Sequence, residues 1–238
     1  MAAKICEGKT KKVFAAENDG SKVIIFFKDD ITAFNGKRHD IIPEKGAISA
    51  YISSAIFKLL NENGVKTHFI EYIPPNKMLA WKLNMIPLEI VCRNIATGSL
   101  LKRLPMLKKG ERLKKPIIEF FYKSDELGDP LLNECHLEYI VNREAIEEMK
   151  QITLKANEIL KKFFEELGFT LVDFKLEFGT TMQGELMIGD ELTCDTMRLW
   201  INGESFDKDI YRRGGSPEDV LKAYRKVYEA IKERIELK

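Results

Sequence analysis

The sequence predicts a globular protein of mixed helices and strands, folded as one large domain or as two closely packed lobes. Its 238 residues slightly exceed the roughly 100–200 residues of one domain, which leaves ample chain for a core. Hydrophobic residues make up 45% of the chain and charged residues 32%, as in folded globular proteins. Short segments with the two-residue period of strands also alternate with longer segments of helical period. The first third of the chain is expected to be rich in strands, with a single helix.

The composition argues against several classes of protein. The net charge is +1, so the charge balance indicates neither nucleic acid nor an anionic membrane as a partner. The first residues lack the apolar core of a signal peptide, and no apolar run is long enough to span a bilayer. Four cysteines without a CxxC pair indicate reduced thiols, which predicts a cytoplasmic protein. These are Cys6, Cys92, Cys135 and Cys194.

A basic turn is expected near the start of the chain. The tripeptide Gly-Lys-Thr begins at Gly8, but a P-loop also needs a glycine five residues earlier, where Ala3 stands. A strand rather than a helix is predicted to follow. The backbone of Gly8, together with Lys9 and Lys11, can still cover phosphates, as the glycine loops of kinases do. The alternative is a basic hairpin that faces solvent.

The remainder of the first third is interpreted from its periodicity. An apolar stripe predicts a helix over 48–63, which Gly64 is placed to end. A polar loop is predicted over 29–37, and a connector between lobes over 84–87. Strands are predicted over 22–28, 68–73 and 78–83.

The segment that follows indicates a phosphate site. A mostly apolar strand over 88–93 carries one acid, Glu89, and one arginine, Arg93. Gly98 permits close approach of a ligand to the backbone. Ser99 at the start of a helix offers a hydroxyl and N–H groups to a phosphate, and Arg93 can add a bidentate contact. The alternative for Arg93 is an ion pair with Glu89, because residues four apart on a strand share a face.

The second half of the chain alternates strands with two capped helices. Asn142 is predicted to cap a helix that runs to Leu167, with Gly168 at its end. The last helix is predicted to begin at Ser216, with proline at its first position. Further strands are predicted over 117–123, 171–179, 185–188 and 195–200, and a charged loop over 207–215.

The strand from Leu171 to Gly179 is the one around which a site is expected to form. Alternate residues are apolar, and the others, Asp173, Lys175 and Glu177, form a ladder of acid, base and acid. If a turn joins this strand to the next, Glu177 and Asp190 face each other. Two such carboxylates repel unless a cation lies between them, and Mg²⁺ with a nucleotide fits these ligands. The alternative is a half-buried strand with a solvated charged face.

Together these motifs resemble the SAICAR synthetase family, the phosphoribosylaminoimidazole-succinocarboxamide synthases of purine biosynthesis. The resemblance covers essentially the whole chain, with the motifs in the same order. The most specific motifs are IPLEIVCRNIATGS, from Ile86 to Ser99, and LVDFKLEFG, from Leu171 to Gly179. Supporting motifs are EGKTKKVF, KDDITAFNGK, FFYKSDELGDP and GDELTCDTMRLW.

The resemblance implies an α+β fold of two lobes, a β-rich lobe over 1–84 and a larger α/β lobe over 85–238, with ATP in the cleft. It implies an ATP-dependent ligase that joins L-aspartate to 5-amino-1-(5-phosphoribosyl)imidazole-4-carboxylate (CAIR) and releases ADP and phosphate. The carboxylate is expected to react as an acyl phosphate, because its oxygen must become a good leaving group. Mg²⁺, a cytoplasmic location, and a homodimer or higher homo-oligomer are also expected.

The resemblance further implies roles for single residues. The metal ligands are expected to be Glu177 and Asp190, and the residues around the reacting carboxylate Asp173, Lys175 and Glu89. The residues that contact ATP are expected to be Gly8, Lys9 and Lys11 at its phosphates, and Lys82, Leu83 and Met85 at its base. The residues that clamp the CAIR phosphate are expected to be Arg93, Ser99 and Arg198.

The remaining substrate contacts are less specific. Lys208 and Arg212 are expected to close over the substrates, and Lys123 and the loop over 30–37 are candidates for the L-aspartate pocket. The alternative function is a small-molecule kinase, which would share the lysine loop and the paired acids but would yield a phosphorylated product without an amide. A silent nucleotide-binding module would lack the paired acids, and both are present here.

Overall fold

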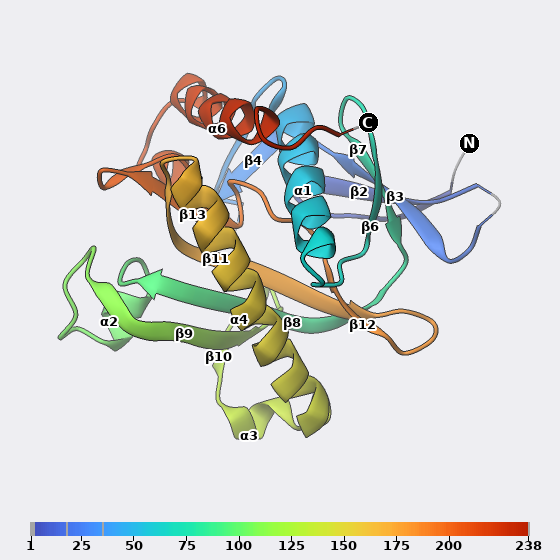
Figure 1. The fold of residues 1–238 in the computed structure, drawn as a ribbon, viewed down its shortest axis with the longest axis horizontal. Helices are drawn as coiled ribbons and strands as arrows, with labels where there is room; N and C mark the ends of the chain where they lie inside the picture. The colour runs from blue at the N-terminus through green and yellow to red at the C-terminus, as the bar shows by residue number, and fades with distance from the viewer. Residues whose placement is uncertain (1–2, 18, 35, 238) are drawn as a thin grey trace.

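The computed structural model describes residues 3–17, 19–34 and 36–237. In this part of the chain helices are combined with three β-sheets and pack on the two larger ones, which confirms the predicted α+β fold (Figure 1). Residues before 84 form a five-stranded sheet and a hairpin, so the prediction that the first third is rich in strands is confirmed. Residues from 84 onward form the largest sheet. That the two parts are lobes with a boundary between 84 and 85 stays a prediction.

The first sheet has the strand order β1-β2-β3-β7-β6, and neighbouring strands are antiparallel. Helix α1 (Lys45–Glu62) packs on β3, β6 and β7 with Ile52, Ile56 and Leu60 fully buried. The predicted strands and helix are confirmed, with their ends shifted by a few residues. The strands are β1 (Lys4–Glu7), β2 (Lys11–Ala15), β3 (Lys22–Phe27), β6 (Phe69–Ile73) and β7 (Lys77–Trp81).

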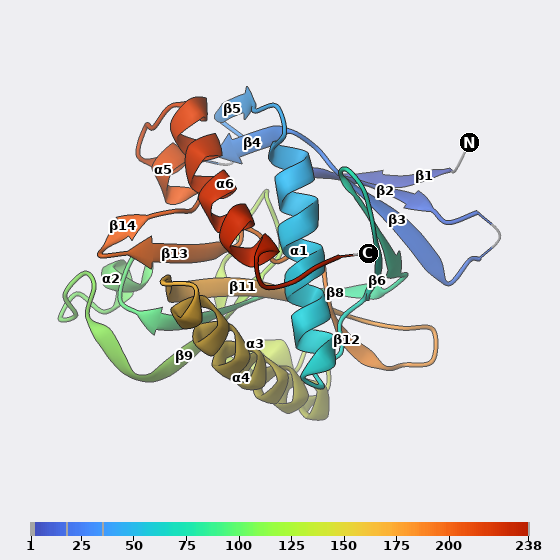
Figure 2. The same cartoon turned by 45° about the horizontal axis from the view of Figure 1, so that its top comes forward.

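A separate hairpin of β4 (Asp30–Ala33) and β5 (Arg38–Ile41) precedes α1. The prediction of a polar loop over 29–37 is therefore wrong for residues 30–33. Ile31 and Ala33 are buried and their neighbours are partly exposed, so this segment has the alternation of a strand in spite of its polar residues. Figure 2 shows the hairpin beside α5, which comes from the other end of the chain.

The second sheet has the strand order β10-β9-β8-β11-β13-β14, with β12 paired to the end of β11. The prediction of a connector over 84–87 is wrong, because β8 begins at Asn84 and pairs with β11 from there. The backbone of this segment finds its hydrogen-bond partners in the sheet. The strands are β8 (Asn84–Ile95), β9 (Arg112–Tyr122), β10 (Leu131–Leu132), β11 (Thr170–Thr180), β12 (Leu186–Gly189), β13 (Met197–Ile201) and β14 (Glu204–Ser205).

The long helices confirm the predicted caps. Helix α4 (Arg143–Glu166) packs on β8 and β11, and the side chain of Asn142 accepts a hydrogen bond from the N–H of Ala145 at 2.8 Å. Helix α6 (Pro217–Lys232) begins with the predicted capping box at Ser216 and packs against α1. The predicted charged loop over 207–215 contains a short helix instead. The short helices are α2 (Leu100–Arg103), α3 (Glu134–Leu137) and α5 (Asp209–Arg212).

Strand β11 is enclosed on both faces. Phe174 and Phe178 on one face belong to the core. On the other face Asp173 and Glu177 are only 4% and 3% exposed. The alternative of a solvated charged face is therefore wrong. The charged side chains of β11 face other charged groups of the protein, and that arrangement defines the site described below.

The structure also describes the cysteines and the apolar character of the helices. All four cysteines are free thiols, as predicted, with Cys92 and Cys194 buried and Cys6 and Cys135 exposed. Among the described residues no helix combines the length and the apolar character that crossing a membrane requires.

Candidate active site

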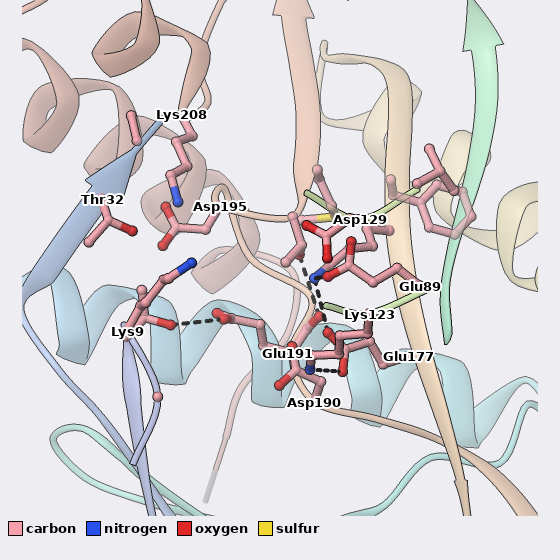
Figure 3. Close-up of a pocket in the computed structure, with 18 of the residues that line it drawn as sticks. Lys9, Thr32, Glu89, Lys123, Asp129, Glu177, Asp190, Glu191, Asp195 and Lys208 are labelled. Carbon is pink, nitrogen blue, oxygen red and sulfur yellow. Dashed lines mark hydrogen bonds and ion pairs between the residues drawn. The ribbon is translucent and has the colours of Figure 1, made fainter. Parts of the chain in front are cut away.

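A pocket of about 530 Å³ is lined by residues from distant parts of the chain. They come from the β1–β2 turn and the start of β2, the β4–β5 hairpin, β8 and the segment before α2, the segment after β9, β11, the segment after β12, β13, and α5 with the residue before it. Eight basic and eight acidic side chains line it. Figure 3 shows Lys9, Lys208 and Glu177 reaching this space from three different elements. So many charges of both signs around one space indicate a site for highly charged ligands.

The floor of the pocket is the antiparallel pair β8 and β11. Asp173 lies opposite Arg93, and Glu177 lies opposite Glu89. Because alternate residues of a strand share a face, the acid–base–acid ladder of β11 and the two charged residues of β8 point into the same space. The predicted alternation of β11 is therefore confirmed, whereas its pairing with β8 is a finding of the structure.

Three lysines and four carboxylates form one end of the pocket, which we call the lysine end. The Lys175 Nζ lies 2.5 Å from a Glu89 oxygen and 3.0 Å from a Glu177 oxygen, and the Lys123 Nζ lies 2.5 Å from the other Glu177 oxygen. Burial lowers the pKa of Lys175, but nearby carboxylates outweigh burial and hold this pKa above its ordinary value. The lysine end consists of Lys11, Lys123, Lys175, Glu89, Glu177, Asp190 and Glu191.

Asp190 reaches the lysine end from the segment after β12. Gly189 pairs with Glu177, so the predicted turn does bring Asp190 next to Glu177. The Lys11 Nζ lies 2.8 Å from an Asp190 oxygen and also pairs with Glu191. Burial raises the pKa of Asp190, but Lys11 and other lysines outweigh burial and hold the pKa well below its usual range. Its φ of 60° is a left-handed conformation that aspartate tolerates better than most residues.

Three arginines and their partners form the other end of the pocket, which we call the arginine end. Arg93 donates from three nitrogens, to Glu119 at 2.5 Å, Asp173 at 3.1 Å and Ser99 at 3.2 Å. Arg198 shares the same Asp173 oxygen at 2.7 Å. The predicted alternative, an ion pair of Arg93 with Glu89, is wrong, because Glu89 pairs with Lys175 instead. The arginine end consists of Arg93, Arg198, Arg212, Ser99, Glu119, Asp173 and Asp209.

Asp209 links α5 to the arginine end. One of its oxygens accepts from Arg198 Nε at 2.9 Å and the other from Arg212 at 2.7 Å. Asp207, which is fully buried, accepts from the N–H groups of Leu199 and Asp209 and so anchors the start of α5 on β13. These contacts set the position of Lys208 and Arg212, which both line the pocket.

Most of the predicted site residues line this pocket, and three do not. Lys82, Leu83 and Met85 are absent from its lining. Leu83 and Met85 pack instead over Gly179 and Gly189, just beyond Glu177 and Asp190. A Cβ at Gly179 would lie 2.8 Å from the Leu83 Cβ, so only glycine permits this approach. The predicted residues that line the pocket are Gly8, Lys9, Lys11, Glu89, Arg93, Ser99, Lys123, Asp173, Lys175, Glu177, Asp190, Arg198, Lys208 and Arg212.

Several charged residues of the site were not predicted. Glu191 is not among the predicted site residues, although it follows Asp190 in the same acidic segment; in the structure it pairs with Lys11. Glu119, the single acid in an apolar stretch of β9, joins Arg93 to Arg103. A lone acid in a buried strand was the available signal for Glu119, since such a group requires a partner.

The lysine end offers oxygen ligands to a cation. No group of three or more acids, histidines or cysteines among residues 3–17, 19–34 and 36–237 is arranged to hold a metal by itself. Mg²⁺, however, is commonly held by one or two carboxylates together with substrate phosphates and water. Glu177 and Asp190 supply two neighbouring carboxylates beside three lysines that suit phosphates, so the donor set fits Mg²⁺ carried by a nucleotide.

Comparisons of the whole chain with known proteins identify one family. The family model of SAICAR synthetase matches residues 4–231. The phosphoribosylaminoimidazole-succinocarboxamide synthase of Sulfurisphaera tokodaii is 49% identical over 234 residues, 97% of this chain and 98% of that protein. The crystal structure of the enzyme from Ehrlichia chaffeensis superposes with a TM-score of 0.91 at 42% identity and covers 96% of this chain and 98% of that one. A SAICAR synthetase in complex with ADP superposes with a TM-score of 0.90 at 42% identity, over 97% and 98% of the two chains.

Proposed function

The chain belongs to the SAICAR synthetase family, and from this premise we propose how its pocket carries out the family reaction. The protein is an ATP-dependent ligase of purine biosynthesis, which joins L-aspartate to CAIR and releases SAICAR, ADP and phosphate. The alternative of a small-molecule kinase is not favoured, because the relatives and the family model bear the name of the synthase.

One distance supports the assignment that we propose, with the ATP phosphates at the lysine end and the CAIR phosphate at the arginine end. Asp173 and Glu177 are four residues apart on β11, about 13 Å at the rise of a strand. The reaction uses two phosphorylated substrates, and a separation of this order suits a pocket that holds the triphosphate at one end and the ribonucleotide phosphate at the other. Each end provides clustered cations for one of them.

The lysine end is our proposed site for the ATP phosphates and the reacting carboxylate. Lys9, Lys11 and the Gly8 backbone cover the phosphates from the β1–β2 turn, and Lys175 lies beside the carboxylate. Glu177 and Asp190 hold Mg²⁺ in this proposal, and the ion would shield the charge of the transferred phosphoryl group. The segment from Lys82 to Met85 contacts the adenine, a proposal supported by the partly exposed side chain of Met85 next to Gly189.

The arginine end is our proposed site for the phosphate of CAIR. The guanidinium groups of Arg93 and Arg198 meet at Asp173 and lie near Ser99, so a phosphate there receives donors from planar groups of fixed orientation. Asp173 and Glu89 lie toward the reacting carboxylate, while Lys208 and Arg212 of the α5 region lie over the substrates.

The proposed chemistry has two steps. An oxygen of the CAIR carboxylate attacks the γ-phosphorus of ATP, and the bond to ADP breaks, which forms an acyl phosphate. The amine of L-aspartate then attacks the carbonyl carbon, phosphate leaves, and loss of a proton from nitrogen completes the amide. The residues of the pocket orient the reactants and neutralise charge, and no protein nucleophile is needed.

Coupled measurement of ADP release tests the proposal. With ATP, Mg²⁺ and CAIR present, ADP release is expected to need L-aspartate, and SAICAR is expected to form in equal amount. ADP release that is indifferent to both CAIR and L-aspartate would overturn the proposal. Release with CAIR alone, together with a stable phosphorylated product, would support the kinase instead.

We also propose a cytoplasmic location, two lobes over 1–84 and 85–238, and a homodimer or higher homo-oligomer. The free thiols and the place of the reaction in purine biosynthesis support the location. Exposed apolar side chains such as Tyr139, at 93% exposure, and Met106 are compatible with contact between copies. Light scattering during size-exclusion chromatography tests the oligomeric state.

A further inference from the structure

Two charged residues that do not line the pocket lie behind Arg93. The Arg93 Nε donates to Glu119 of β9 at 2.5 Å, and Glu119 also accepts from Arg103, the last residue of α2. Arg93 lines the pocket, whereas Glu119 and Arg103 do not. Any influence of these two residues on a bound substrate must therefore pass through residues that do line it.

The contact between α2 and β9 is made by a planar group, and the two elements lie side by side in Figures 1 and 2. Arg103 donates to one Glu119 oxygen from Nε at 3.1 Å and also from Nη2, which leaves the other oxygen to Arg93. Its guanidinium lies 5.7 Å from the centre of the Phe121 ring. Glu119 and Phe121 are two residues apart on β9 and share a face, so one side chain of α2 contacts the strand at two points. Lysine, with a single nitrogen, does not reproduce this geometry.

The same helix determines the position of Ser99. Ser99 directly precedes α2, and its hydroxyl does not cap the helix but accepts from Arg93 Nη2 at 3.2 Å. Because α2 is a single turn, Ser99 and Arg103 are separated by only ~6 Å along its axis. A shift of the helix at Arg103 therefore also moves Ser99. Arg103 is thus connected to both the guanidinium and the hydroxyl that we assign to the CAIR phosphate.

The charges behind the arginine end alternate in sign. They run from Arg103 to Glu119, Arg93, Asp173 and Arg198, and each acid lies between two arginines. Three positive charges against two negative charges leave one positive charge in surplus. Without Arg103 the surplus would vanish, and the buried carboxylate of Glu119 would be compensated by Arg93 alone. The charge that a phosphate meets at Arg93 therefore depends on Arg103.

We propose that Arg103 is a positioning residue for the phosphate of CAIR. It neutralises Glu119, so that the charge of Arg93 remains available to the phosphate, and it holds α2, so that Ser99 stays within reach of the same phosphate. Arg103 touches neither the substrate nor the reacting atoms. This inference rests on the proposed function, which assigns the CAIR phosphate to the arginine end.

Steady-state titration of each substrate in the full-length enzyme tests the inference. Arg103→Met is expected to raise KM for CAIR about tenfold, while KM for ATP and for L-aspartate and kcat change less than about twofold. Ribose 5-phosphate carries a phosphate but no imidazole, so its constant for competitive inhibition against CAIR is expected to rise by a similar factor. Arg103→Lys keeps the charge without the planar contacts, and its effect is expected to be about threefold.

A second change at Glu119 separates the role of charge from a general structural defect. In Arg103→Met the acid left without its partner opposes the phosphate, so Arg103→Met/Glu119→Gln is expected to bring KM for CAIR back to within about threefold of the unaltered enzyme. A structural defect would not be repaired by the loss of a further contact. A double variant as impaired as Arg103→Met would overturn the inference.

Lys102→Met is the matched control. Lys102 precedes Arg103 on the same helix, so its variant removes the same charge from almost the same place. Its side chain is exposed and lies outside the pocket lining. All three KM values are expected to stay unchanged. Melting curves establish that each variant is folded, and if Arg103→Met does not fold, Arg103→Lys and the double variant carry the test.

Three further results would overturn the inference. The first is an unchanged KM for CAIR in folded Arg103→Met. The second is an equal rise in all three KM values, which would mean general loosening of the pocket. The third is an equal rise of KM for CAIR in Lys102→Met, which would mean that the contact with Glu119 has no part in the effect. Failure of the proposed function is distinguishable, because it would already show in the unaltered enzyme as ADP release indifferent to CAIR and L-aspartate.

Discussion

The lysine end and the arginine end of the pocket carry similar charges but hold them differently. Lys175 brings one nitrogen between two carboxylates, Glu89 and Glu177, that come from neighbouring strands. Arg93 uses three nitrogens for three separate acceptors and is almost fully buried. One end is thus a set of compact charges shared among acids, and the other is a set of planar groups with fixed orientation.

The difference shows what each end is suited to bind. A lysine holds a carboxylate by charge with little demand on direction, so its partner can be exchanged for another cation or for a phosphate that moves during the reaction. An arginine held at several nitrogens presents its remaining donors in one plane, which suits a phosphate that stays in place from binding to release. The predictions below test this contrast, from the largest expected effect to the smallest.

Removal of one charge at the lysine end is expected to have the largest effect. Glu177→Gln removes a buried carboxylate that lies between Lys123 and Lys175. Loss of the proposed metal ligand and of its charge should raise the barrier by several kcal/mol, so turnover should fall on the order of 10³-fold. ADP release by the folded variant measures this.

A neighbouring acid provides the control for this variant. Glu185 pairs with exposed Lys66 and lies outside the pocket lining, just before β12. Glu185→Gln should therefore leave turnover unchanged. Normal turnover in well-folded Glu177→Gln would remove Glu177 from the reaction and with it the assigned role of the lysine end.

Asp207, which anchors the start of α5 beside the arginine end, is expected to make a contribution to folding stability that depends on pH. Burial raises the pKa of Asp207 to about 7, well above the ordinary value near 4. The folded protein therefore binds a proton here that the unfolded chain releases, so this contribution to stability is complete below about pH 4 and is lost as pH rises toward 7. The effect is on the order of a few kcal/mol.

Urea unfolding of the unaltered protein and of Asp207→Asn at several pH values measures this effect. Asparagine mimics the protonated acid, so the unaltered protein should lose stability relative to the variant between pH 4 and 7. His68, whose pKa burial lowers to about 4, has the opposite slope, but it is common to both proteins and cancels. A pH-independent difference between them would contradict the prediction.

Replacement of the planar group at the arginine end should change affinity rather than chemistry. Arg93→Lys keeps the charge but loses the contacts to Asp173 and Ser99 in their present geometry. KM for CAIR is expected to rise at least tenfold, roughly 1.4 kcal/mol or more, with little change in KM for ATP. Arg112→Lys, on an exposed part of β9, is the matched control. An equal rise in both KM values would refute the contrast between the ends.

The smallest effect is expected at the edge of the lysine end. Lys9 pairs with Asp125 at 2.6 Å, but both side chains are largely exposed. Lys9→Ala is expected to change the free energy of unfolding by less than ~0.5 kcal/mol, because exposed ion pairs contribute little. KM for ATP should rise a few-fold, since the proposed role of this lysine is to cover the phosphates of bound nucleotide. A loss of kcat as large as that of Glu177→Gln would show that Lys9 acts in the chemistry.

The sequence predicted the charged face of β11 and the approach of Asp190 to Glu177, because both depend on local pattern. The alternation around Lys175 placed its charged neighbours on one face, and the short turn to Asp190 brought two carboxylates together. The segments it predicted wrongly, 30–33 and 84–87, contain polar residues or proline that mask a strand. In both cases pairing with another strand stabilises the extended conformation that local propensity does not favour: β4 pairs with β5, and β8 pairs with β11.

The sequence by itself determined the fold class, the helix caps at Asn142 and Ser216, and the apolar and charged faces of the strand from Leu171 to Gly179, because these depend on residues a few positions apart. Only the tertiary structure decided that Glu119 orients Arg93 and that Arg38 stacks on Tyr211, 173 positions later in the chain. Such pairs carry no local signal. They form because the packing of apolar faces brings distant segments together, and a buried charge must then find its partner among the groups that packing has placed beside it.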